Sequence, residues 1–153
     1  MTGRMTQPNQ AVSLDELIAA MLFVSDAYSM DAAAYLHRPS GEIYWQSIEA
    51  LVGELYEDEK LPAGFETSPE YLRIPNKRQL NVGKALVFAF VRQFMPHAYA
   101  EVAAFFRKPG AYGRFREMVE DSDLLERWRA FQDAGEKEAM RAWCRENGVA
   151  LSK

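Results

Sequence analysis

The run over residues 82–94 constrains this chain more than any other segment, because its apolar side chains fall on nearly every side of a helix. A helix with so wide an apolar surface is stable in water only when other elements surround it. The sequence therefore predicts a helix here at the buried centre of the fold, with a core made by Leu86, Val87, Phe88, Phe90 and Val91.

Two shorter helices are predicted after this run. Pro96 suits the first turn of a helix over residues 96–107, because proline lacks the N–H that a first turn leaves unbonded. Lys108-Pro109-Gly110 ends that helix. The next helix is predicted over residues 111–120, with one apolar side formed by Tyr112, Phe115 and Val119.

A longer helix is predicted in the last part of the chain. Asp123 and Glu126 have the spacing of a capping box, and Asn147-Gly148 is typical of a helix end. Gly135 lies inside this helix and costs about 1 kcal/mol relative to alanine, so a bend or break is open at that point. The apolar stripe begins at Leu124, Trp128 and Phe131 and continues weakly to Ala139, Ala142 and Trp143.

The first half of the chain combines one helix with a β-hairpin. Ser13 and Glu16 form a capping-box pattern at the start of a helix that ends near residues 25–28. Residues 33–37 and 42–46 are aromatic-rich runs on either side of Arg38-Pro39-Ser40-Gly41, which predicts a hairpin.

A third strand is predicted over residues 71–74. Pro75 suits the end of this strand, because proline has no N–H to donate to a neighbouring strand. A short helix is predicted over residues 48–56, followed by a loop over residues 64–69. Together these elements predict an α+β fold that is mostly helical, with a small antiparallel sheet of about three strands packed on four or five helices.

Length and composition bound the class of protein. The chain has 153 residues, which suits one domain, and we expect a flexible tail over residues 1–12 and a single globular domain over residues 13–153. Cys144 is the only cysteine, no segment reaches the apolar length of a membrane helix, and residues 1–12 lack a signal-peptide core. A cytoplasmic location is therefore expected. The net charge of −4 argues against broad, non-specific binding to nucleic acid.

Several motifs occur in an order that is similar to a known family. The first motif is Tyr35-Leu36 with Ser40-Gly41-Glu42-Ile43. The second is Tyr71-Leu72-Arg73-Ile74-Pro75, which is followed by Lys77, Leu80 and Gly83. The last three are Gly110-Ala111-Tyr112-Gly113-Arg114-Phe115, Leu125-Glu126-Arg127-Trp128 and Ala142-Trp143-Cys144-Arg145-Glu146-Asn147-Gly148.

Over about residues 14–151 this ordered set resembles the bacterial family named uncharacterised protein family 0158. The chain departs from the family's usual pattern at Gln79, Asn81 and Arg129. Because the family has no established activity, the resemblance implies a compact bacterial cytosolic domain and no particular reaction.

The best candidate for ligand binding is the segment over residues 107–116. It places two glycines, an aromatic ring and four basic side chains at the start of a predicted helix, where free N–H groups and the helix dipole favour an anion. The candidate ligand-binding residues are Arg107, Tyr112, Arg114 and Arg116. In the alternative interpretation these residues turn the chain, and the arginines pair with neighbouring acids.

No catalytic residue, metal site or cofactor is predicted. His97 and Glu101 are four apart on a helix, but two ligands are too few for zinc. Cys144 is expected to be a small, partly buried structural thiol. Asp26 with Asp31, and the acidic run over residues 57–59, are expected to bond local backbone or water.

Three functions therefore stay open. The first is a non-catalytic binding or regulatory module that acts through a protein partner. The second is phosphate or nucleic-acid binding through residues 107–116, which place basic side chains and an aromatic ring at a predicted helix start. The third is an enzyme whose site is assembled from distant residues and has no recognisable signature.

Overall fold

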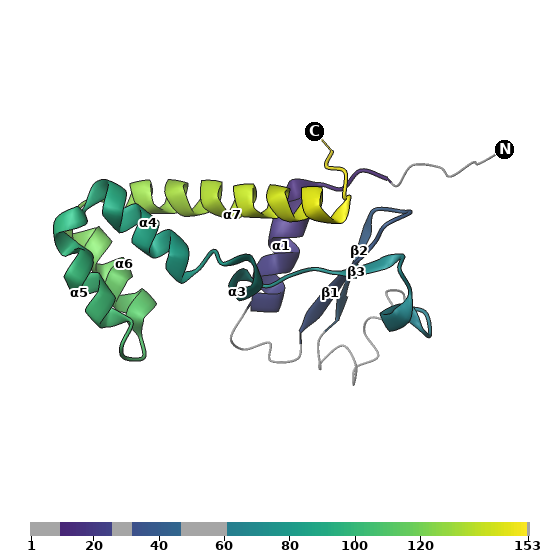
Figure 1. The fold of residues 1–153 in the computed structure, drawn as a ribbon, viewed down its shortest axis with the longest axis horizontal. Coiled ribbons are helices and arrows are strands. Elements are labelled where there is room, and N and C mark those ends of the chain that lie inside the picture. The colour runs from purple at the N-terminus through teal and green to yellow at the C-terminus, as the bar shows by residue number, and fades with distance from the viewer. Residues whose placement is uncertain (1–9, 26–31, 47–60, 153) are drawn as a thin grey trace. The chain divides into compact units, whose positions relative to one another are not determined.

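A computed structural model of the chain describes residues 10–25, 32–46 and 61–152 (Figure 1). These residues form a mostly helical α+β fold with one three-stranded antiparallel sheet, so the predicted fold class is confirmed. The chain divides into two compact units. We call residues 1–80 with 139–153 the sheet unit and residues 81–138 the helical unit.

Helix α1 (Leu14–Ser25) opens the sheet unit as its sequence predicts. The Ser13 hydroxyl accepts a hydrogen bond from the Glu16 N–H at 3.3 Å, which satisfies one of the donors that a helix start leaves open. At the other end the Ser25 hydroxyl donates to the Met21 carbonyl at 2.6 Å and accepts from the Lys77 N–H at 2.9 Å. Ser25 thereby joins the end of α1 to the start of the short helix α3 (Lys77–Leu80).

The predicted sheet is confirmed strand by strand. Strands β1 (Ala33–His37) and β2 (Glu42–Gln46) form the hairpin, and β3 (Tyr71–Arg73) pairs with the other edge of β1, giving the order β2-β1-β3. All pairs are antiparallel, with Tyr35 opposite both Tyr44 and Arg73. Gly41 ends the turn with φ +75, a conformation that glycine adopts without strain.

The two faces of the sheet differ in chemistry because side chains alternate along each strand. Ala34 and Leu36 are buried on the face that packs against α1, where Phe23 meets Trp45 edge-on at 4.7 Å. The opposite face has aromatic side chains, and there Tyr35 contacts Phe65 of the 3-10 turn η2 (Phe65–Thr67) at 4.8 Å. This turn lies inside the loop predicted over residues 64–69.

The two ends of the described chain meet in the sheet unit. The sequence predicts that Val12 belongs to the flexible tail, but this residue is only 2% exposed. The Val12 N–H donates to the Ala150 carbonyl at 2.9 Å, and Val12 forms a β-bridge with Leu151. Val12 therefore belongs to the packed part of the chain. Residues 1–9, the predicted helix over residues 48–56 and the possible extension of α1 to residue 28 lie outside the described residues.

The helical unit contains four helical segments around one apolar core. They are α4 (Lys84–Phe94), the 3-10 turn η3 (Pro96–Ala98) that runs into α5 (Tyr99–Phe105), α6 (Ala111–Asp121), and the first part of α7 (Leu125–Asn147). Phe90 of α4, Phe115 of α6 and Trp128 of α7 form the centre of this core.

Helix α4 is shorter and less enclosed than its sequence predicts. It begins at Lys84, because Asn81 adopts φ 59 and ends the preceding helix α3. Val87, Phe90 and Val91 are fully buried. Lys84, Ala85, Arg92 and Gln93 are exposed, so α4 contributes one face to the core rather than its whole circumference.

The predicted capping role of Asp123 is wrong. Asp123 adopts φ 63, and the Leu124 N–H donates to the Val119 carbonyl at 2.8 Å, five residues back. The Asp123 N–H donates to the Glu120 carbonyl at 3.1 Å. Together these bonds are a Schellman motif, which ends α6 and leaves Leu124 to start α7. The sequence pattern fits both roles because Asp is tolerated in the left-handed region and at N-caps.

Helix α7 runs through Gly135 without a break and ends at Asn147, where Gly148 has φ 69 and the Val149 N–H donates to the Cys144 carbonyl at 2.8 Å. Gly135 allows a close approach of α4, since a Cβ placed there would lie 2.5 Å from Leu86 Cδ2. The absence of a side chain at residue 135 is thus a packing requirement within the helical unit.

Replacing Gly135 by alanine should test this requirement. Alanine favours a helix over glycine by about 1 kcal/mol, so Gly135→Ala should stabilise the chain by about that amount once Leu86→Ala has removed the clash. In the unmodified chain the gain should be cancelled or reversed. The free energies of unfolding of the two single variants, the double variant and the parent, measured in urea, would give the coupling. Equal effects of Gly135→Ala in both backgrounds would contradict the proposed contact.

Candidate functional site

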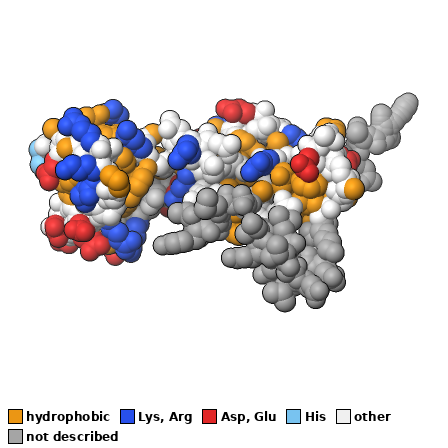
Figure 2. All heavy atoms as spheres, turned by 90° about the horizontal axis from the view of Figure 1, so that it is seen from below, with side chains coloured by type: hydrophobic (Ala, Val, Ile, Leu, Met, Phe, Trp, Pro, Cys, Tyr) orange, Lys and Arg blue, Asp and Glu red, His pale blue; other side chains and the backbone are white. Residues whose placement is uncertain are grey.

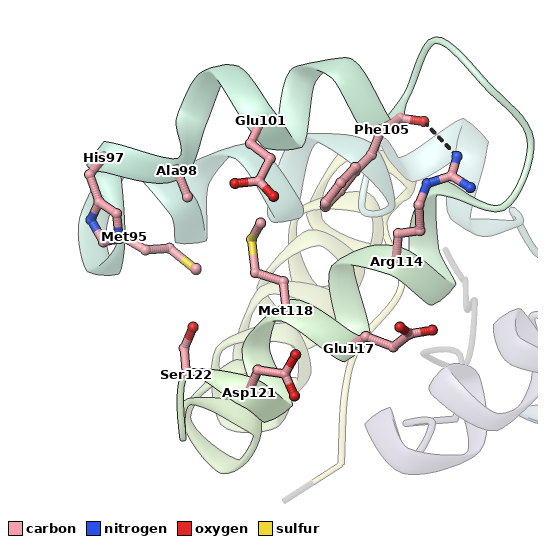
Figure 3. A pocket seen from close by; sticks show the side chains of 10 residues that line it. All are labelled: Met95, His97, Ala98, Glu101, Phe105, Arg114, Glu117, Met118, Asp121 and Ser122. Atoms are coloured by element: carbon pink, nitrogen blue, oxygen red, sulfur yellow. Dashed lines mark hydrogen bonds between the residues drawn. The ribbon is translucent and has the colours of Figure 1, made fainter.

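A concave groove of about 450 Å³ lies between α5 and α6 in the helical unit, and we call it the α5–α6 groove. Figure 3 shows Glu101 of α5 and Met118 of α6 pointing toward one another across it, with His97 and Arg114 at opposite ends. Its volume is within the range typical of ligand-binding sites in proteins.

Helical periodicity explains why these residues meet. On α6 the groove side chains recur three or four residues apart, which places them on one face of a helix. The members of this row are Arg114, Glu117, Met118, Asp121 and Ser122. The facing row on η3 and α5 follows the same spacing, with His97, Ala98, Glu101 and Phe105.

The floor of the groove is apolar. Met95 is 2% exposed and Ala98 7% exposed, and both belong to the core of the helical unit, while Phe105 and Met118 are half-buried against that core. Methionine side chains are flexible and polarizable, so they adapt to partners of different shape. An apolar side chain that enters the groove would therefore find a surface able to repack around it.

The rim of the groove is acidic. Glu101, Glu117 and Asp121 are all exposed to solvent, and each lines the groove. Among the described residues no group of three or more His, Cys, Asp or Glu side chains has the arrangement of a metal site. The arrangement instead offers three hydrated carboxylates around an apolar floor, which suits contact with a cationic group.

Arg114 lies at one end of this groove and is held by the backbone. Its Nη2 donates to the carbonyls of Pro109 at 2.8 Å, Phe105 at 3.2 Å and Lys108 at 3.4 Å. Its guanidinium also lies 5.8 Å from the centre of the Phe105 ring. Arg114 therefore adds a charged donor to carbonyls at and beyond the end of α5, and it fixes the connection between α5 and α6.

The other predicted ligand-binding residues are not brought together with Arg114. Tyr112 and Arg116 face a second groove between α6 and α7, and Arg116 Nε donates to Glu120 Oε1 at 3.2 Å. Arg107 is exposed just beyond the end of α5. The predicted basic cluster is thus distributed over separate faces, because consecutive residues of a helix point in different directions.

The acidic row of α6 is not predicted from the sequence. In the sequence Glu117 and Asp121 fit the role of neighbouring acids for the arginines, and Glu101 is grouped only with His97. The spacing of Arg114, Glu117, Met118 and Asp121 was a usable signal for one helix face, but no local signal shows that α5 covers that face. The acidic groups at Asp26, Asp31 and residues 57–59 lie outside the described residues.

Cys144 lies in the sheet unit and is 1% exposed, so it is more deeply buried than the partly buried thiol that the sequence predicts. Burial raises the pKa of its thiol to about 11, and the neighbouring Arg145 opposes that rise only in part. The thiol is therefore protonated at neutral pH, whereas nucleophilic catalysis requires the thiolate. Cys144 contributes to packing.

A scan against protein-family models, a search of curated proteins and a search of solved structures each gave no match to this chain. The resemblance to uncharacterised protein family 0158 therefore stays a prediction. Function has to be argued from the chemistry of the grooves, since a fold class does not fix a function.

Within the described ranges, no helix combines the length and the apolar character needed to cross a membrane.

Arginines 114 and 116 should behave differently when replaced by alanine. Arg114→Ala removes charge-assisted bonds to backbone carbonyls and should lower the free energy of unfolding by about 1–2 kcal/mol. Arg116→Ala removes an exposed pair with Glu120 and should cost less than about 0.5 kcal/mol. Denaturant unfolding of the two variants checks this order. A larger loss in Arg116→Ala would contradict the structural role of Arg114.

The pKa of Cys144 predicts a pH dependence of stability. Between pH 9 and 11 the thiol ionises in the unfolded chain, at its ordinary pKa of 9.0, before it ionises in the folded chain. Ionisation of the thiol stabilises the unfolded state, so the free energy of unfolding should fall by roughly 2–3 kcal/mol between pH 9 and 11. Below pH 9 the contribution of the thiol to the free energy of unfolding is constant.

Denaturant unfolding of the parent and of Cys144→Ala between pH 8 and pH 11 isolates the thiol, because every other group titrates alike in both chains. The difference between the two chains should shrink as the pH rises above 9. A difference that does not change with pH would exclude the raised pKa.

Proposed function

We propose that this protein is a non-catalytic binding module of the bacterial cytosol, and that its α5–α6 groove receives a basic amphipathic segment of a protein partner. The observation that carries the proposal is the combination of a methionine-containing apolar floor with three exposed carboxylates on the rim of one groove. Amphipathic segments bind such grooves by placing apolar side chains on the floor and charged side chains at the rim.

The charge of the groove selects the chemistry of the partner. Glu101, Glu117 and Asp121 supply negative charge, and the only guanidinium in the lining, that of Arg114, is directed to backbone carbonyls. Lysine or arginine side chains of a partner can therefore approach the carboxylates without competition from Arg114. Complementary charges of this kind speed association and discriminate against acidic partners.

The exposure of the carboxylates favours recognition over catalysis. General acid–base chemistry requires a carboxyl group held within reach of a bound substrate, with a pKa adapted to its task by a shielded environment. Glu101, Glu117 and Asp121 are exposed on the rim rather than enclosed. Hydrated carboxylates of this kind suit ion pairs with a partner that covers them.

The space-filling view is consistent with a recognition surface. Over the helical unit, at the left of Figure 2, acidic side chains gather along the lower edge, and basic and apolar side chains are interspersed above them. Such segregation of charge orients an incoming partner before contact is made.

A pull-down from bacterial lysate tests the proposal. The immobilised parent chain should retain a protein whose binding segment is basic and amphipathic, and Glu117→Gln with Asp121→Asn should reduce the retained amount by about threefold to tenfold, as expected for the loss of two rim ion pairs. Raising the salt concentration should have a similar effect, because exposed charges are screened.

The matched control is Asp123→Asn with Glu126→Gln, which removes the same charge from exposed positions outside the groove. It should retain the partner as the parent does. A partner retained equally by the groove variant, or a parent chain that captures nothing, would overturn the proposal.

A further inference from the structure

A second groove, of about 200 Å³, lies between α6 and α7 on a different face of α6 from the α5–α6 groove, and we call it the α6–α7 groove. Its floor is made by Phe115 and Trp128, which are 1% and 8% exposed. The side chains around the floor are Tyr112, Arg116, Leu125, Arg129 and Gln132.

Two arginines from different helices line this groove, and none of the described residues that line it carries a carboxylate. Arg116 uses its Nε to donate to Glu120, which leaves its two Nη groups, and its side chain is 60% exposed. Arg129 is exposed, and no hydrogen bond or ion pair holds it within the described part of the chain. Guanidinium groups donate pairs of hydrogen bonds that match the oxygens of a phosphate.

The same groove presents an aromatic surface beside the arginines. Tyr112 is 55% exposed, more than any other large apolar or aromatic side chain in the described residues. Its ring is held edge-on by Phe106, with the ring centres 5.2 Å apart and the planes at 89°. A fixed and exposed ring of this kind can stack on a nucleobase. The Gln132 amide both donates and accepts, as the edge of a base requires.

From this juxtaposition we propose that the α6–α7 groove binds a single nucleotide unit, with its base against Tyr112 and its phosphate between Arg116 and Arg129. The volume is below that of most whole-ligand pockets, about 300–1,000 Å³, so one partly enclosed nucleotide fits better than a larger ligand. The net charge of −4 disfavours a long nucleic acid. The site is independent of the α5–α6 groove.

Calorimetric titration at low salt tests the proposal with three probes: adenosine monophosphate, inorganic phosphate and a five-nucleotide single strand. The parent should bind the nucleotide more tightly than phosphate. Arg116→Gln with Arg129→Gln should weaken nucleotide binding at least tenfold. Tyr112→Leu should weaken nucleotide binding about fivefold or more, as expected for the loss of a stacked ring, and leave phosphate binding unchanged.

The matched control is Arg92→Gln with Arg127→Gln. These arginines carry the same charge on α4 and α7, but they lie over the rings of Tyr99 and Phe94 outside the α6–α7 groove. The control should bind the nucleotide as the parent does. Equal weakening in the control would show a general charge effect and overturn the site.

The probes also separate the two sources of a nucleotide unit. A single strand that binds more tightly than the monophosphate, with a slope of log affinity against log salt of about −0.7 for the one phosphate between Arg116 and Arg129, identifies the end of a strand. A monophosphate that binds as tightly as the strand identifies a free nucleotide. Failure of both the strand and the monophosphate to bind the parent, or equal binding of phosphate and nucleotide, would overturn the proposal.

Discussion

The edge-to-face packing of Phe90, Phe115 and Trp128 is the interaction on which the helical unit depends. Trp128 meets Phe115 at 5.0 Å and Phe90 at 5.3 Å, with interplanar angles of 88° and 69°. These rings come from α6, α4 and α7, so one cluster fixes three helices. Aromatic pairs in this geometry contribute about 0.5–1.5 kcal/mol beyond the burial of their area, and they define orientation as well as distance.

Because Phe115 and Val119 point into that core, the directions of the other side chains of α6 are fixed. One flank of the helix carries Glu117 and Asp121 toward α5, and the other carries Tyr112 and Arg116 toward α7. A short helix between two neighbours thus separates an acidic groove from a basic, aromatic one. Arg114 supports this arrangement by bonding to the carbonyls that precede α6. The proposed peptide and nucleotide sites are consequences of how one helix is oriented.

Much of the secondary structure could be predicted because its signals are local. Ser13 and Glu16 mark the start of α1, Gly41 ends the hairpin turn, and Gly148 ends α7 through bonds that span only a few residues. The prediction that Asp123 caps α7 is wrong because it too depends on a local signal. A short acidic side chain suits both a helix start and a left-handed helix end, and the choice depends on whether Leu124 can reach the Val119 carbonyl once α6 has formed.

By itself the sequence determined the fold class, the hairpin with its third strand, and the aromatic side chains available for the core. Only the tertiary structure decided what the charged side chains of residues 107–116 do. Arginine side chains are long, and their partners depend on which elements pack beside the helix: Arg114 meets backbone carbonyls, and Arg116 faces a groove. The acidic rim of the α5–α6 groove could not be predicted from the sequence either, because Glu101 and Glu117 line the same groove only when α5 lies against α6.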